Sequence, residues 1–182
     1  MNEINSISAS NPICAKLLER VFKILKAIGY KKIMAKLNLG DIFEIDTKKG
    51  KGYFKLVGFD KHHGELIKVY YRLYQDVPPL NELENGSYYI YFPLKYALRQ
   101  KLVKHVGNIV VSSQFIKPQY CREKHIIGRE FLGWFIVDMR TMKMKLAKEL
   151  NKEQKKLSPC GIINDTLLKK RLEQGWRLEN WV

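Results

Sequence analysis

The sequence reads Tyr53-Phe54-Lys55-Leu56-Val57-Gly58-Phe59, then a polar turn over 60–64, then Glu65-Leu-Ile-Lys-Val-Tyr-Tyr-Arg-Leu-Tyr74. Both runs are rich in β-branched and aromatic residues, which favour strands, and a glycine-containing turn separates them. A similar run, Ile42 to Ile45, precedes them and ends at the turn 48–52. Runs of this kind joined by short turns predict a meander or a small curved sheet, and an SH3-like start is one interpretation.

Later segments extend this sheet and add helices to it. Pro93 is expected to open a short helix, because proline suits the first helical position. We expect a loop over 112–124 and a central strand over 131–137, with further strands over 87–92, 102–106, 109–111 and 142–146. The predicted fold class is therefore α+β: a twisted, mostly antiparallel sheet with an N-terminal amphipathic helix and a C-terminal helix.

The C-terminal helix carries its own start and stop signals. Asn164 or Asp165 can accept the free N–H groups of its first turn, and the leucines that follow recur at helical spacing. Gly175 supplies the left-handed residue that ends many helices, and Trp176 follows where a large side chain can fold back. Nothing in this block can do chemistry, so it predicts structure only.

The N-terminal region differs from the rest of the chain. Residues 1–38 are expected to form a basic helical extension, in which Asn11-Pro12 starts an amphipathic helix, and residues 39–182 an α+β domain. Such a helix can lie on a membrane or a partner, or pack on the protein's own core. The segment before it lacks the order of a signal peptide, and no apolar run is long enough to span a bilayer.

The chain is strongly basic. Its 33 Lys and Arg against 18 Asp and Glu leave a net charge of +15. The excess is concentrated in residues 93–182, which carry nineteen basic and eight acidic side chains. A field of this sign attracts nucleic acid, acidic lipid surfaces or acidic proteins, although a lysine-rich solvated surface is an equally simple interpretation.

Three cysteines, Cys14, Cys121 and Cys160, are widely spaced. Their odd number predicts free thiols in a reducing cytoplasm rather than a disulfide framework. Cys121 and His125 could form a thiol–imidazole pair, but their segment has loop composition and no orienting third group.

No motif points firmly to catalysis. The histidines lack the spacing of a zinc site, and Lys49-Gly50-Lys51-Gly52 lacks the spacing of a phosphate-binding loop. Glu44 and Asp46 could act as paired carboxylates, but solvent-facing strand residues are the simpler interpretation. We expect no catalytic residues, no metal and no cofactor.

Nucleic-acid binding is a second possibility. Aromatic residues interleaved with cations on a sheet can stack bases. The candidates are Tyr70, Tyr71, Arg72 and Tyr74, or Tyr88, Tyr89 and Tyr91, together with a basic stretch from Arg140 to Lys156. No recognised nucleic-acid-binding signature accompanies them, and alternate tyrosines usually pack on a core.

Several blocks, taken in order, resemble immunity protein family 26 of bacterial polymorphic-toxin systems, which also carries the name of a phosphotriesterase, HocA. The resemblance covers roughly residues 39–178 and includes Gly40-Asp41-Ile42-Phe43, Phe92-Pro93-Leu94 and the closing block from Leu157 to Trp176. Its structural residues are Gly40, Asp41, Phe43, Pro93, Trp134, Asp138, Gly161, Asn164, Asp165, Gly175 and Trp176. The N-terminal helix lies outside it, and Ile163 stands where an aromatic residue is expected.

The resemblance implies a bacterial, cytoplasmic immunity protein that neutralises a cognate toxin by covering its surface, without catalysis. A charge of +15 would suit an acidic toxin. A nucleic-acid-binding accessory protein, for example in phage defence, is the alternative, and a hydrolase is suggested by the family name only. The predicted partner-binding residues are Arg72, Tyr74, Tyr89, Arg140, Lys143 and Lys145.

Overall fold

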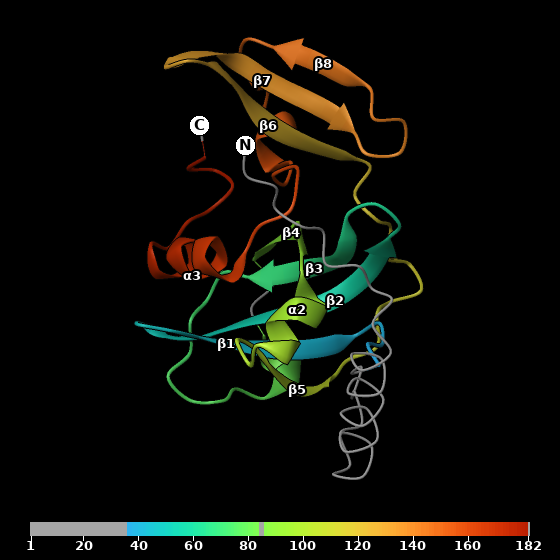
Figure 1. Ribbon diagram of the computed structural model, residues 1–182, viewed down its shortest axis with the longest axis vertical. Coiled ribbons are helices and arrows are strands. Elements are labelled where there is room, and N and C mark those ends of the chain that lie inside the picture. The colour runs from blue at the N-terminus through green and yellow to red at the C-terminus, as the bar shows by residue number, and fades with distance from the viewer. Residues whose placement is uncertain (1–35, 84–85, 182) are drawn as a thin grey trace, which may run out of the picture. The chain divides into compact units, whose positions relative to one another are not determined.

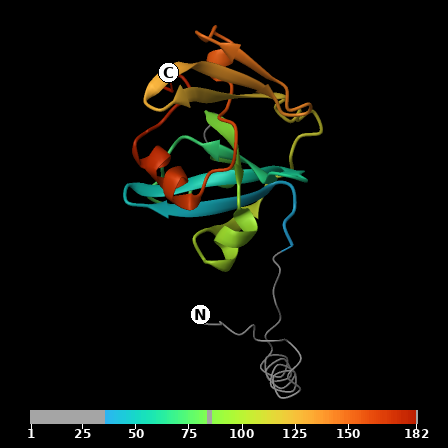
Figure 2. The ribbon, with the colours of Figure 1, turned by 45° about the horizontal axis from the view of Figure 1, so that its top comes forward.

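The computed structural model describes residues 36–83 and 86–181. The predicted N-terminal helix and Cys14 lie outside these residues. The described part contains two antiparallel sheets (Figures 1 and 2) rather than the single sheet that we expected. The five-stranded sheet has the order β4-β3-β2-β1-β5, and its strands are β1 (Asp41–Thr47), β2 (Gly50–Asp60), β3 (Gly64–Tyr70), β4 (Ser87–Phe92) and β5 (Lys104–Asn108).

The three-stranded sheet has the order β6-β7-β8. Its strands are β6 (Tyr120–Ile127), β7 (Glu130–Asp138) and β8 (Met144–Ala147). The predicted central strand is confirmed as β7, and the segment expected to pair back on it is confirmed as β8. The predicted loop over 112–124 is wrong at its end, where β6 begins. The helices are α2 (Leu94–Arg99) and α3 (Asp165–Glu173), with short 3-10 turns at Leu80–Glu82 and Gln154–Lys156.

Alternation along the strands builds the main core on one face of the five-stranded sheet. Phe43 and Ile45 of β1 share this face with Phe54 and Leu56 of β2, because alternate strand residues point the same way. The remaining strand members are Ile67, Val69, Tyr88, Ile90 and Phe92. Buried residues of α2 and α3, among them Leu94, Leu168 and Leu172, pack against them. The hydrophobic run around Tyr53 to Tyr74 therefore provides the centre of the fold.

The ends of α3 follow the predicted signals. Asn164, rather than Asp165, is the cap: its Oδ1 accepts from the N–H of Leu167 at 2.9 Å. Gly175 has φ of 62°, a left-handed conformation that favours glycine, and the N–H of Trp176 donates to the carbonyl of Arg171. Trp176 then packs edge-on against Tyr88, with ring centroids 4.9 Å apart. The closing block thus braces the sheet.

One short segment, 158–163, connects the two sheets. Its N-terminal half pairs in parallel with β6, where the N–H of Arg122 donates to the carbonyl of Ser158 and that of Cys160 to the carbonyl of Arg122. Its C-terminal half meets β4, where the N–H of Ile163 donates to the carbonyl of Tyr91 at 3.0 Å. The same short segment therefore extends both sheets.

Cys121 and Cys160 form a disulfide, which corrects the prediction that they are free thiols. The two residues are 39 positions apart, yet the pairing of segment 158–163 with β6 brings their Cα atoms to 5.1 Å. This proximity comes from a parallel pairing across the gap between two sheets, and spacing in the sequence does not reveal it. The bond also excludes a thiol–imidazole pair between Cys121 and His125, which the sequence already disfavoured, and the His125 ring packs on Phe135, with ring centroids 4.4 Å apart.

Arg122 is a fully buried cation at the same junction. Its Nε donates to the carbonyl of Leu157 and one terminal nitrogen to the carbonyl of Leu178, and its guanidinium lies 4.8 Å from the ring centroids of both Trp134 and Trp181. These contacts attach the C-terminal segment to the three-stranded sheet. The charged residues around Arg122 are the reason that the sequence predicted a loop where β6 begins.

The other expected elements differ in smaller ways. β5 (Lys104–Asn108) confirms the first of the two strands predicted on either side of Gly107-Asn108, whereas the second, over 109–111, is wrong because these residues form no strand. Gly40 has φ of 93°, consistent with its predicted role in a turn, and its N–H donates to the carbonyl of Leu56. Among the described residues, no helix is long and apolar enough to cross a membrane.

Candidate partner-binding surface

The β7–β8 hairpin exposes an unusual amount of apolar surface. Met144 is 65 % exposed, and Met142, Leu146 and Phe131 are each about half exposed. Ile126 and Ile127, at the end of β6, are exposed as well. A soluble protein seldom leaves a group of large apolar side chains open unless a partner covers them. This group, defined by Ile126, Ile127, Phe131, Met142, Met144 and Leu146, is called the hairpin surface below.

Cations alternate with these apolar residues along the chain. Lys143 and Lys145 are both exposed and flank Met144. Neither lysine forms a hydrogen bond through its side chain or an ion pair with any residue that the structure describes. Within β8, Met144 and Leu146 lie on one face and Lys145 on the other, because alternate strand residues point to opposite faces. The strand therefore offers apolar contact on one side and positive charge on the other.

β8 is also an edge strand. It pairs with β7 on one side, and within residues 36–83 and 86–181 no strand pairs with its other side. Figure 1 shows β8 on the side of the small sheet that faces away from the five-stranded sheet. An edge strand presents unpaired N–H and C=O groups, which can accept a further strand from a partner.

A cleft of about 810 Å³ lies beside the hairpin surface. It is formed by three segments: the β2–β3 turn, the connector before β6, and the β7–β8 turn. The polar residues that line it are Asp60, His62, His63, Lys117, Gln119 and Arg140. Met142 lines the cleft and belongs to the hairpin surface, so the two features are continuous.

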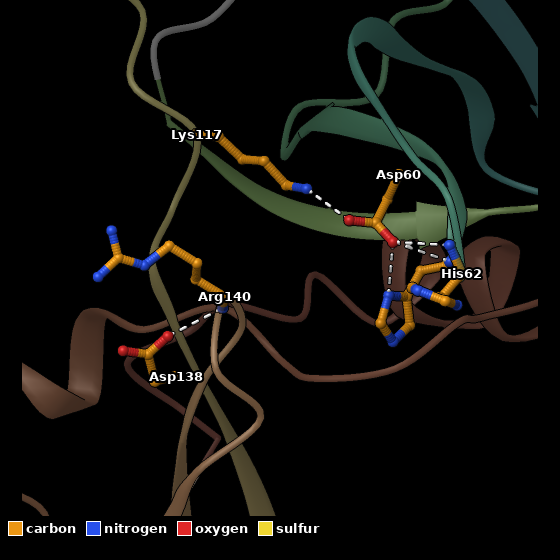
Figure 3. Close-up of polar contacts among 6 residues, drawn as sticks. Asp60, His62, Lys117, Asp138 and Arg140 are labelled. Atoms are coloured by element: carbon orange, nitrogen blue, oxygen red, sulfur yellow. Dashed lines mark hydrogen bonds and ion pairs between the residues drawn. The ribbon is translucent and has the colours of Figure 1, made fainter.

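The carboxylate of Asp60 is fully engaged within its own cluster (Figure 3). It accepts from Lys117 Nζ at 2.8 Å and from the backbone N–H groups of His62 and His63 at 2.9 and 3.1 Å, and it contacts His63 Nδ1 at 2.9 Å. The hydrogen bond from Lys117, aided by these other donors, lowers the pKa of Asp60 well below its usual range. Asp60 is therefore an ionised structural anchor for the β2–β3 turn.

Asp138 plays the same part on the opposite wall. Its Oδ1 accepts from the N–H groups of Arg140 and Thr141 at 2.9 and 3.1 Å, and its Oδ2 accepts from Gln119 Nε2 at 3.0 Å. The Arg140 guanidinium makes no hydrogen bond or ion pair within the described part of the chain, and Figure 3 marks a contact with Asp138 only at the Arg140 backbone N–H. The acids hold the walls, while the Arg140 cation remains available to a ligand or partner.

The predicted partner-binding residues fall into two groups. Arg140, Lys143 and Lys145 come together on the β7–β8 hairpin. Arg72 and Tyr74 lie elsewhere, after β3, where the guanidinium stacks on the tyrosine ring at 4.9 Å. Tyr89 of β4 is half-buried against Phe115. The structure therefore brings together only half of the predicted set.

The remaining candidates for chemistry were the carboxylate of Glu44 and a possible metal site. Glu44 is 4 % exposed, which corrects the expectation of a solvent-facing residue; its carboxylate accepts from Tyr53 Oη and Lys51 Nζ, each at 2.8 Å. Burial alone would raise the pKa of Glu44, but these two hydrogen bonds lower it overall. No group of three possible metal ligands occurs among the described residues.

The sequence predicted neither the hairpin surface nor the cleft, although it did predict Arg140, Lys143 and Lys145 as partner-binding residues. A usable signal was present in Met142 to Leu146, where apolar residues and lysines alternate as in a strand with one unpartnered face. No such signal marks the cleft, because Asp60, Lys117 and Arg140 come from three distant segments.

No family model, curated protein or solved structure matches this chain. The resemblance to immunity protein family 26 stays a prediction.

Proposed function

We propose that the protein is an immunity-type inhibitor that binds a cognate bacterial toxin domain and covers its working surface, without turnover. The observation that carries this proposal is the combination of an exposed apolar hairpin with cations that have no acidic partner. Apolar residues at the centre of an interface supply most of its affinity, and charges at its rim steer the encounter. The expected partner is therefore a protein domain with an acidic rim around an apolar patch.

The cleft suits an anchoring side chain of that partner. A carboxylate from the toxin could enter it and meet the Arg140 guanidinium, because Asp60 and Asp138 are already paired within their own turns. Arginine recognises a carboxylate with two parallel hydrogen bonds, which gives both energy and orientation. The apolar walls from Ile116, Met139 and Met142 would exclude water around the pair.

The nucleic-acid alternative receives less support. Tyr70, Tyr71, Tyr88 and Tyr91 are each at most 8 % exposed, so they cannot stack on bases without leaving the packed interior. Tyr89 is half-buried against Phe115. The remaining arguments for nucleic acid are the exposed Arg72, which stacks on Tyr74, and the positive charge, which an acidic protein would satisfy equally well.

The cellular compartment in which the protein acts also stays a prediction. The expectation of a reducing cytoplasm depended on free thiols, and two of the three cysteines form a disulfide. Disulfides persist mainly in oxidising compartments. A toxin met in such a compartment is therefore compatible with the same inhibitory mechanism.

The test is a growth-rescue assay with the toxin encoded next to this protein. We expect the wild-type protein to restore growth, and the variant Arg140→Glu/Lys143→Glu/Lys145→Glu to lose both rescue and binding to the purified toxin domain. The control Lys152→Glu/Lys155→Glu/Lys156→Glu makes the same change of charge on an exposed segment outside the hairpin surface. It should rescue growth. Equal loss in both variants, or no rescue by the wild type, contradicts the proposal.

A further inference from the structure

Two lysines face each other at the centre of the five-stranded sheet. Lys55 of β2 and Lys68 of β3 are directly opposite partners in the antiparallel register. Directly opposite side chains lie on the same face of a sheet, and like charges in this arrangement destabilise the pair of strands. The face in question is the one opposite the main core.

This position would ordinarily suit apolar residues. On one side of the lysine pair lies a cluster that contains Ile42, Tyr53 and Tyr70, and on the other a cluster that contains Val57 and Leu66. Tyr53 and Val57 flank Lys55 on the same face of β2, because alternate residues share a face. The two cations thus interrupt what would otherwise be one continuous apolar surface.

Neither lysine has an acidic partner among the described residues. Lys55 Nζ is 3.5 Å from the carbonyl oxygen of Val110, at the limit of a hydrogen bond, and Lys68 Nζ lies 5.4 Å from the ring centroid of Tyr70. Both residues are partly buried. Burial, together with the charge of Lys68, lowers the pKa of Lys55. The free protein therefore holds two cations close together with no countercharge from the part of the chain that the structure describes.

A hollow of about 530 Å³ opens over the pair. Its floor contains the two lysines and the ring of Tyr70, and its walls include Leu80, Asn81 and Asn108. None of the described residues that line it is acidic. The volume is within the range of sites for small molecules, and such sites combine apolar walls with a few placed polar groups.

We propose that this hollow is a binding site for a small phosphorylated molecule, with its phosphate monoester group between Lys55 Nζ and Lys68 Nζ. The phosphate would supply the countercharge that the pair lacks. The apolar side chains of Leu80 and Tyr70 would contact the organic part, and the exposed amide of Asn81 would offer hydrogen bonds to its hydroxyl or ring groups. Asn108 would contribute its side-chain oxygen as an acceptor, because its Nδ2 already donates to Leu39 and Asp41. The site is separate from the hairpin surface and does not depend on the proposed inhibition of a toxin.

Titration calorimetry on the full chain at physiological salt tests this inference. The probes are inorganic phosphate, ribose 5-phosphate and AMP, which distinguish the free anion from a phosphorylated organic molecule. We expect AMP or ribose 5-phosphate to bind more tightly than inorganic phosphate. Lys55→Gln and Lys68→Gln should each weaken binding about tenfold or more, since a hydrogen bond to a charged group is lost. The control Lys170→Gln removes one exposed charge from α3 and should bind like the wild type.

A second measurement separates a binding role from a structural one. If the lysines are kept for a ligand, removing one of them relieves the repulsion, and Lys68→Gln should unfold at a higher temperature than the wild type when no ligand is present. A lower unfolding temperature for both lysine variants would mean that the pair stabilises the fold, and this would overturn the inference. So would the absence of binding by all three probes, or equal weakening in the Lys170→Gln control.

Discussion

The two sheets of this protein are stabilised in different ways. The five-stranded sheet covers a deep apolar core, to which α2 and α3 contribute buried side chains. The three-stranded sheet has few fully buried residues, and it depends on a buried arginine, a disulfide and segment 158–163. Apolar side chains that would fill a core in the first sheet lie open on the second. The difference suggests that the larger sheet is the scaffold and the smaller one the surface that meets a partner.

The largest expected effect is a loss of stability in the core of the five-stranded sheet. Phe54 is fully buried and lies 5.5 Å, ring to ring, from both Phe43 and Phe92. Phe54→Ala should lower the free energy of unfolding by about 3–5 kcal/mol, because it removes apolar contact and leaves a cavity. Phe59→Ala is the matched control on the same strand, since Phe59 is 48 % exposed and should change stability by at most about 0.5 kcal/mol. Urea unfolding measures both; similar values would contradict this account of the core.

The disulfide gives the next largest effect and should act on the smaller sheet. Cys160→Ser removes the link between segment 158–163 and β6, and it should cost about 2–4 kcal/mol by the usual range for a bridge of this kind. Thermal unfolding of the oxidised wild type, the reduced wild type and Cys160→Ser measures it. The reduced wild type should behave like the variant. If reduction leaves the unfolding temperature unchanged, the disulfide does not hold the sheet in place.

Replacing Arg122 tests whether the two sheets are stabilised independently. Arg122→Ala removes charge-assisted hydrogen bonds to the carbonyls of Leu157 and Leu178 and the contacts with two tryptophans. We expect a loss of about 1.5–3 kcal/mol, with amide exchange accelerated in β6, β7 and β8 and little changed in β2 and β3. Arg129→Ala, an exposed arginine in the β6–β7 turn, is the control. Equal acceleration in both sheets would mean that they form one cooperative unit.

The smallest expected effect is the pH dependence of the stability that Asp60 contributes. The pKa of Asp60 is lowered by its hydrogen bonds, so the ionised form stabilises the fold at neutral pH, and this contribution is lost as the pH falls below the ordinary value of 3.8. Asp60→Asn should therefore be less stable than the wild type at pH 7 by at most about 1 kcal/mol, as expected for an ion pair near the surface. The gap should shrink as the pH falls below 4. A gap that is constant with pH would show that the charge of Asp60 contributes nothing.

The same contrast explains what could be predicted from the sequence. The strands β1 to β4 of the larger sheet, a cap at Asn164 or Asp165 and the stop at Gly175 are local signals, and they predicted most of the scaffold. The division into two sheets, the disulfide and the burial of Arg122 depend instead on pairings and contacts between residues far apart in the chain, among them those of segment 158–163. The cleft is non-local for the same reason. Three of the six predicted partner-binding residues lie together because they are neighbours in sequence.

The most direct test of the central claim is amide hydrogen exchange on the protein alone and in complex with the toxin domain encoded beside it. The account predicts slower exchange in the complex over β8 (Met144–Ala147), the edge strand beside the hairpin surface, and over the β7–β8 turn that borders the cleft. It predicts no change in β1 and β2, whose amides already lie within the larger sheet. Protection confined to the five-stranded sheet, with β8 exchanging as fast as in the free protein, would contradict it.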